Sequence, residues 1–315
     1  MKETAQAPDA ARRPVNLIYS VDERVPLLTL VVLGLEHAAL LVASLTATLF
    51  IARAVGAGPS QTEALVNVGL IAGGIASILQ ALPRYGLGSG FFCLHTSSFI
   101  YFQASVHAAA TGGLSLVFGM TALSGLAEAA LSKLVPRLRR LFPPEVSGLV
   151  VATVGIALAP YAVRSLAGMG RGQTTPDGHA LIVGLVTIGL IVGLNVWVKG
   201  ILRLYSILIG IIVGYLMAYA MGIIPTEHLE RIKHLSFIAL PHLEHPGFSF
   251  DIRFLVPFLI AAVCASLKLT GDITTCQKIN DSEWKRVDMH SVGRAFVADG
   301  LGTFAAGMFG GTGLA

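Results

Sequence analysis

The feature that most constrains the fold is the segment 254–277, in which two charged residues follow a long apolar run. Residues 254–267 carry no charge, and Lys268 and Asp272 come shortly after them. These fourteen residues span roughly 21 Å as a helix, whereas the hydrocarbon core of a bilayer is about 30 Å thick and takes about 20 residues. A helix that crosses a membrane here must continue to about Cys276, so it carries Lys268 and Asp272 into the membrane.

These two charges have two interpretations. An ammonium group at mid-membrane costs about 3 kcal/mol, so Lys268 must face protein, water or a partner. Residues four apart share a helix face, which makes Asp272 the first partner to consider. Ionisable groups inside membranes are typical of functional sites. The alternative is that Lys268 snorkels to the cytoplasmic interface and that Asp272 only neutralises it.

The rest of the chain has the composition of a polytopic membrane protein. Hydrophobic residues make up 54% of it and charged residues 13%, against about 25% charged residues in a soluble domain. We predict an all-α polytopic membrane protein, with residues 1–25 as a cytoplasmic tail and 26–315 as the transmembrane domain. Nine apolar runs have spanning length, at about 26–51, 64–82, 91–110, 114–134, 146–163, 180–198, 204–224, 254–276 and 292–310.

Basic residues predict the orientation of these spans. With the N-terminus in the cytoplasm, fifteen lysines and arginines fall on the cytoplasmic side and six on the other, as the positive-inside rule requires. We therefore expect a multi-pass protein of the cell (inner or plasma) membrane, with the lipid bilayer as its partner. The basic residues lie in short loops and not on one folded face, so no nucleic-acid partner is expected.

The third apolar run, 91–110, is interrupted by residues that do not suit a smooth helix. Gly86, Gly88 and Gly90 precede cysteine, histidine, hydroxyl and aromatic residues. Backbone that leaves a helix at membrane depth is tolerated only where it is buried in protein or lines a cavity. We predict that residues 93–100 break the helix near a binding site. The alternative is an ordinary helix whose serines hydrogen-bond to its own backbone.

Three other ionisable residues inside predicted spans are candidates for a function. Glu36 and His37 interrupt the first run, where they are either functional or simple packing residues. Asp299 lies in the ninth run and is either an intramembrane carboxylate or a helix cap near the cytoplasmic end.

No metal, cofactor or enzymatic chemistry is expected. The loop 225–253 holds several histidines and glutamates, but their spacings match no standard metal signature. Cys93, Cys264 and Cys276 form neither a metal spacing nor an obvious disulfide pair. A membrane enzyme that uses Glu36, His37 and the loop histidines would lack a nucleophile–base constellation.

Four stretches, taken in order, resemble one family. LGLEHAALLVASL resembles its first helix, with Glu36-His37 where a Gln-His pair occurs, and TSSFIYF resembles the extended segment of its third helix. SLKLTGD resembles its eighth-helix motif, which reads Glu-x-Thr-Gly-Asp in xanthine-type members, and ADGLGTFAAGMFGG resembles the ninth helix and the lead into the tenth. This is the nucleobase–cation symporter-2 family, or nucleobase–ascorbate transporters, which includes bacterial uracil and xanthine permeases.

The resemblance implies a fold, an activity and a site. Members have fourteen spans in two inverted repeats of seven, here a first repeat over about 26–224 and the start of a second over about 254–315. They are secondary active transporters of xanthine- or uracil-type nucleobases, with protons as the implied coupling ion, and homodimers are common. The implied substrate-binding residues are Ser97, Ser98, Phe99, Lys268 and Asp272. The implied coupling or gating residues are Glu36, His37 and Asp299.

Two departures from the family leave two alternatives open. Lys268 stands where members carry a carboxylate, and lysine only donates hydrogen bonds whereas a carboxylate accepts them from ring N–H groups. A transporter of organic or inorganic anions on the same architecture is therefore the second hypothesis. The chain also ends at Ala315, where members continue into a tenth span with a facing extended segment and four more spans, so an inactive fragment is the third.

The predicted orientation can be tested by labelling. With cysteine placed singly at Arg139 or Lys233 in a background without native cysteines, we expect a membrane-impermeant maleimide to reach the two positions from opposite sides, because an odd number of spans separates them. Labelling of both positions from the same side would contradict the topology.

Overall fold

The predicted all-α membrane fold is confirmed. The computed structural model describes residues 14–15, 17–83, 85–134, 144–169, 175–224, 230 and 245–315. Its helices are α1 (Leu27–Ser44), α2 (Thr46–Ala54), α3 (Pro59–Ala81), α4 (Phe102–Leu131), α6 (Pro144–Leu166), α7 (Gly178–Trp197), α8 (Ile201–Leu204), α9 (Ser206–Ala220), α11 (Ile252–Asn280) and α12 (Met289–Met308). Every predicted apolar run overlaps at least one of them.

Five helical stretches in the described part of the chain are long and apolar enough to cross a membrane. They are Leu27–Arg53, α3, α4, α7 and α11, and α9 is a shorter apolar helix. The count of nine spans stays a prediction. Arg139, Lys233 and the loop histidines His228, His234 and His242 lie outside the described residues.

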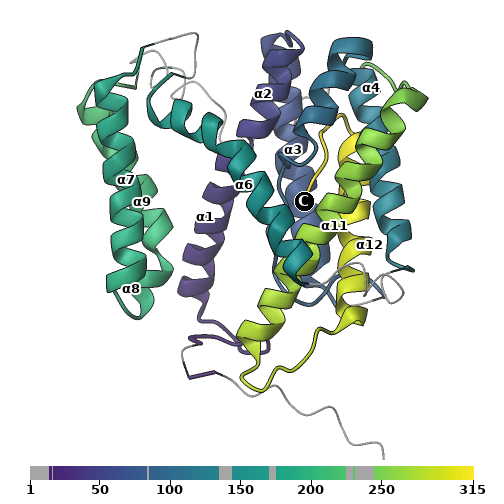
Figure 1. Cartoon of the computed structure of the whole chain (residues 1–315). Coiled ribbons are helices and arrows are strands. Elements are labelled where there is room, and N and C mark those ends of the chain that lie inside the picture. Colours follow the sequence, from purple (N-terminus) through teal and green to yellow (C-terminus); the bar gives the residue numbers. More distant parts are fainter. Residues whose placement is uncertain are drawn as a thin grey trace, which may run out of the picture. The chain divides into compact units, whose positions relative to one another are not determined.

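The chain forms two compact units, and each combines segments that are distant in sequence. The first unit contains residues 44–151 and 243–315, and the second contains residues 26–43 and 152–242. In the first unit, α12 packs against α3, α4 and α11, and Figure 1 shows these four helices side by side. In the second unit, α7 packs along α9. The two repeats implied by the resemblance divide the chain differently and stay a prediction.

Three helices begin at an aspartate whose carboxylate accepts a hydrogen bond from the backbone N–H two residues on. Asp177 caps α7, Asp251 caps α11 and Asp288 caps α12, each at 2.9 Å. The Arg253 guanidinium, 2.6 Å from Asp251, also holds the pKa of that carboxyl below its usual value. Asp299 lies in the interior of α12, so the interpretation of Asp299 as a helix cap is wrong.

The third predicted span is helical only in its second half. The described residues of 82–98 contain no helix, and α4 begins at Phe102. The helix predicted over 91–110 is therefore wrong before Phe102, while the predicted break over 93–100 is confirmed and extends further. Within α4, Gly112 and Gly113 have non-helical backbone angles, with φ of 68° at Gly113, and they separate the third apolar run from the fourth.

Glycines let α4 and α12 touch backbone to backbone. A Cβ on Gly300 of α12 would lie 2.5 Å from the backbone nitrogen of Ala129 and 2.6 Å from the carbonyl oxygen of Gly125, both on α4. A Cβ on Gly125 would in turn lie 2.6 Å from the carbonyl oxygen of Gly300. Small residues permit this close approach between transmembrane helices. The contact holds the polar groups of α4 and α12 at short range.

We expect Gly300→Ala to destabilise the protein by about 1–3 kcal/mol or more, because its methyl group would meet rigid backbone atoms. Gly74→Ala on α3 is the matched control, because a Cβ there meets nothing within 4 Å. The control should gain up to about 1 kcal/mol from the higher helix propensity of alanine. Thermal unfolding of both variants in detergent measures the difference, and equal melting temperatures would contradict the close contact.

Candidate functional site

The extended segment that precedes α4 is fastened along α3 by buried side chains. The backbone N–H of His95 donates to the hydroxyl of Ser77 at 2.8 Å, and the side-chain amide of Gln80 donates to the hydroxyl of Ser89 at 2.9 Å. Gly88, with φ of 67°, turns the chain at the end of α3, where a Cβ would collide with the carbonyl oxygens of α3 residues. Polar groups of α3 thus replace part of the hydrogen bonding that a helix would supply to this segment.

A second extended stretch lies against the first one. The backbone N–H of Ser98 donates to the carbonyl oxygen of Gly313 at 2.9 Å, and the N–H of Ala315 donates to the carbonyl oxygen of Thr96 at 3.1 Å. The two stretches therefore pair in the antiparallel direction. A stretch that pairs with the segment before α4 is therefore present before Ala315, while the tenth span stays a prediction.

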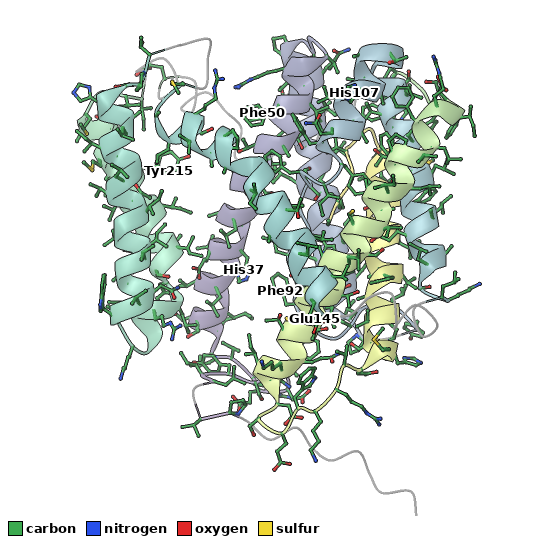
Figure 2. The ribbon with its side chains drawn as sticks, in the orientation of Figure 1. His37, Phe50, Phe92, His107, Glu145 and Tyr215 are labelled. Atoms are coloured by element: carbon green, nitrogen blue, oxygen red, sulfur yellow. The ribbon has the colours of Figure 1, made fainter. Side chains whose placement is uncertain are left out.

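The structure brings Ser97, Ser98 and Phe99 together immediately before α4. Ser97 is buried, and Ser98 accepts a hydrogen bond from the backbone N–H of Ile100 at 3.2 Å. The ring of Phe99 is half-buried and packs near the ring of Phe50, with 6.4 Å between their centroids. Figure 2 marks Phe50 on α2. This placement leaves part of the Phe99 ring accessible beside the extended segment.

Lys268 and Asp272 form an ion pair on α11, as the sequence predicts. Lys268 Nζ lies 3.1 Å from Asp272 Oδ2, and the two side chains are 31% and 39% exposed. The helix continues to Asn280, twelve residues or about 18 Å beyond Lys268. The ammonium group therefore has its partner within the helix and does not extend to the helix end, which disfavours the snorkelling interpretation.

Cysteines connect the extended segment with α11. Cys93 Sγ lies 3.9 Å from Cys276 Sγ, which follows Asp272 by one helical turn. Sequence spacing does not identify this pair, because 183 residues separate the two positions.

Three ionisable side chains meet in the interior of the first unit. His95 Nε2 lies 3.2 Å from Asp299 Oδ1, and the hydroxyl of Ser266 donates to Glu128 Oε1 at 3.1 Å. The carboxyl groups of Glu128 and Asp299 are also close enough to act on each other electrostatically. The three ionisable side chains are at most 1% exposed. This cluster, His95–Asp299–Glu128, thus gathers two carboxyl groups and an imidazole in the buried interior.

Of this cluster, sequence reasoning identified only Asp299 as a site residue. Glu128 carries its own signal, because it is the only ionisable residue in the apolar stretch 114–131. His95 lies within the predicted helix break, but nothing in its local sequence indicates which residue it faces.

Glu36 and His37 belong to the second unit, on α1. The Glu36 carboxylate is buried and accepts hydrogen bonds from the backbone N–H groups of Ile207 and Leu208 in the first turn of α9. A carboxylate is favourable at this positive end of a helix. His37, which Figure 2 labels on α1, places Nδ1 2.7 Å from the carbonyl oxygen of Leu33. A coupling or gating role for either residue stays a prediction.

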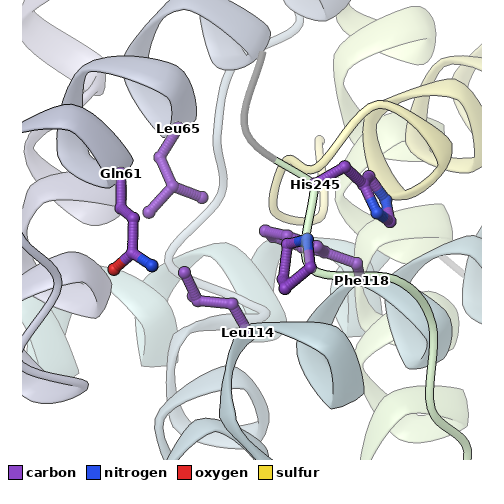
Figure 3. Close-up of a pocket in the computed structure, with 6 residues that line it drawn as sticks. Gln61, Leu65, Leu114, Phe118 and His245 are labelled. Carbon is purple, nitrogen blue, oxygen red and sulfur yellow. The ribbon is translucent and has the colours of Figure 1, made fainter.

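A cavity of about 240 Å³ lies elsewhere in the first unit. Figure 3 shows α3, α4 and the chain before α11 around it, and the residues that line it are Gln61, Leu65, Leu114, Phe118, His245 and Pro246. None of the predicted site residues is among them. Within the residues that the structure describes, no three His, Cys, Asp or Glu side chains are grouped so as to hold a metal ion.

Comparisons with known proteins agree on one family. A family model described as "Permease family", for xanthine and uracil permeases, matches residues 28–315. The chain is 28% identical to the xanthine permease XanP of Escherichia coli (strain K12), over 98% of this chain and 69% of that protein. It is 26% identical to the uric acid permease PucK of Bacillus subtilis (strain 168), over 90% of this chain and 65% of that protein. The chain spans 64% of the length of a relative from Clostridium perfringens and 62% of the xanthine permease of Bacillus subtilis.

The ion pair on α11 predicts an order of stabilities. Asp272→Asn should destabilise the protein more than the double variant Lys268→Met/Asp272→Asn, because only the single variant leaves an ammonium group without its partner. The expected loss lies between the roughly 1 kcal/mol of exposed pairs and the roughly 3–5 kcal/mol of buried pairs.

Thermal unfolding in detergent measures this order. The matched control is Lys278→Met, which removes an exposed lysine from the last turn of the same helix. A double variant no more stable than Asp272→Asn would show that the two charges do not depend on each other.

Proposed function

The chain belongs to the family of xanthine and uracil permeases, and from that membership we propose that it is a proton-coupled secondary active transporter of nucleobases. The observation that supports this most directly is the break before α4, where an extended segment that contacts α11 through Cys93 and Cys276 leads into a helix start. Discontinuous helices of this kind place helix ends and free polar groups at the substrate site of secondary transporters. The named relatives act on xanthine and uric acid, which sets the proposed substrate class.

The ion pair suits one edge of such a base. Xanthine and uracil present ring N–H groups beside carbonyl oxygens. Lys268 has three N–H donors and uses one toward Asp272, so it can donate another to a carbonyl oxygen, and the Asp272 carboxylate can accept from the adjacent N–H. The family has a carboxylate at the position of Lys268, so the lysine adds N–H donors to the proposed site. The Asp272 carboxylate still provides a hydrogen-bond acceptor.

The residues before α4 suit the rest of the base. The backbone N–H groups of Tyr101 and Phe102 at the start of α4 already donate to carbonyl oxygens of Ser98 and Phe99. Ser97 and Ser98 bring hydroxyl groups to this point, and the accessible part of the Phe99 ring offers a surface for stacking. We therefore assign substrate binding to Ser97, Ser98, Phe99, Lys268 and Asp272.

Proton coupling is assigned to the cluster His95–Asp299–Glu128. It is joined to both binding elements, because His95 lies on the extended segment and Ser266, which donates to Glu128, precedes Lys268 by two residues on α11. A change of protonation in the cluster alters hydrogen bonds made by the two elements that hold the substrate. In this proposal Glu36 and His37 act in gating, from the second unit.

The proposed setting follows the family. The protein lies in the cell membrane with its N-terminus in the cytoplasm, its span count is nine over these residues, the two repeats are inverted, and it forms a homodimer. The ion pair gives no support to an anion substrate, because Asp272 offsets the charge of Lys268.

Uptake into proteoliposomes tests the function. We expect labelled xanthine or uracil to accumulate several-fold faster when the outside is acidic, because protons then drive transport inward. Asp299→Asn should abolish this acceleration, since the amide cannot take up the proton, whereas Glu63→Gln, a neutralised exposed carboxylate on α3, should retain it.

Each contrary outcome removes a defined part of the proposal. Uptake that ignores the pH gradient would refute proton coupling. Uptake of organic anions in place of the bases would support the anion hypothesis, and failure of any base to bind or enter would support an inactive chain.

A further inference from the structure

Two of the three cysteines are in contact across the candidate site. All three are free thiols and half-buried. Cys93 Sγ and Cys276 Sγ are 3.9 Å apart. Cys264 lies on the same helix as Cys276 but twelve residues earlier, about 18 Å along the axis, so it is not an alternative partner for the same geometry.

The contact has the geometry of a reduced disulfide pair. A disulfide bond is about 2.05 Å long, so the sulphur atoms must approach by roughly 2 Å. Each sulphur moves by rotation about its own Cα–Cβ bond, and Cys93 lies on non-helical backbone, which adjusts more readily than a helix. Reducing compartments keep such a pair as thiols until an oxidant arrives.

We propose that Cys93 and Cys276 are an oxidation site that forms a reversible disulfide bond and ties the extended segment to α11. The ligand of this site is a small two-electron oxidant of the peroxide class. Cys276 is the better entry point, because it lies four residues before the end of α11. Its neighbour Gln277 accepts a hydrogen bond from the backbone N–H of Asp288, in the loop that follows, at 2.9 Å.

The reaction balances with hydrogen peroxide alone. The Cys276 thiolate attacks one peroxide oxygen, the O–O bond breaks, and a sulfenic acid and one water form after proton transfer. The Cys93 sulphur then attacks the sulfenic sulphur, the S–S bond forms, the S–O bond breaks, and a second water leaves. The two thiols lose two electrons and two protons, which the peroxide takes up, and a dithiol reductant reverses the step by thiol–disulfide exchange.

The bond would act on the binding elements directly. Cys276 follows Asp272 by one turn of α11, and Cys93 precedes Ser97 by four residues on the extended segment. Drawing the two sulphur atoms together changes the spacing between Ser97–Phe99 and the Lys268–Asp272 pair. This consequence rests on the proposed nucleobase transport, whereas formation of the bond does not.

Peptide mapping tests the bond without any transport measurement. Trypsin places each cysteine in a different peptide, with Cys93 in 85–133, Cys264 in 254–268 and Cys276 in 269–278. The full chain in lipid vesicles is treated with hydrogen peroxide, alkylated with N-ethylmaleimide and digested without reduction. We expect peptides 85–133 and 269–278 to be joined, while peptide 254–268 remains alkylated, and dithiothreitol should restore alkylation of both joined peptides.

Matched variants make the result decisive. Cys264→Ser should form the same cross-link, and Cys93→Ser or Cys276→Ser should lose it. A cross-link between two chains through Cys264, or oxidation to sulfinic acid with no cross-link, would overturn the proposal.

If the cross-link forms, base uptake by the wild type should fall after peroxide treatment and recover with dithiothreitol. Base uptake by Cys93→Ser should be unchanged by peroxide. Uptake that is unaffected by a mapped cross-link would refute the effect on transport, and a wild type without any base uptake refutes the proposed function and leaves the cross-link standing.

Discussion

The structure of the first unit depends on satisfying backbone that is not helical at membrane depth. Each unpaired N–H or C=O group in hydrocarbon costs several kcal/mol, so the segment before α4 exists only because protein groups replace the missing helical hydrogen bonds. The hydroxyl of Ser77 and the carbonyl oxygen of Gln80, both on α3, accept from backbone N–H groups of this segment, and the stretch that ends at Ala315 supplies other hydrogen bonds. The extended segment of the candidate site therefore depends on hydrogen bonds from α3 and from residues 313–315.

Close packing of α4 and α12 has a comparable role for the buried charges. Gly125 and Gly300 let the two backbones touch, and that contact brings the Glu128 carboxyl to Asp299. A methyl group on either glycine would meet backbone atoms of the other helix and push the two helices, and with them the two carboxyl groups, apart. The two glycines therefore determine both how closely α4 and α12 pack and how close the two carboxyl groups lie to each other.

Local patterns in the sequence predicted features that lie within one segment, but they did not predict contacts between residues far apart in the sequence. The pairing of Lys268 with Asp272 follows from a spacing of four residues on one helix, and the helix break over 93–100 follows from its glycines and hydroxyl residues. His95, Glu128 and Asp299 come from three separate elements, and only the packing of those elements reveals that they meet. The contact between Cys93 and Cys276 is hidden for the same reason. The sequence left two roles open for Asp299, because a carboxylate suits both the start of a helix and a buried site. The structure decides between them, since Asp288 caps the start of α12 and Asp299 lies in the interior of that helix.

The Lys268–Asp272 pair and the cluster His95–Asp299–Glu128 differ in exposure and in charge balance. Lys268 and Asp272 neutralise each other and remain about one-third exposed, so they exchange hydrogen bonds with a polar ligand at modest cost. The cluster His95–Asp299–Glu128 is fully buried and contains two carboxyl groups with no arginine or lysine among its described contacts. One arm of the cluster contacts the extended segment and the other contacts α11, and these two elements also carry the proposed substrate-binding residues. In the proposed transporter, a displacement of either element would therefore reach both the cluster and the substrate-binding residues.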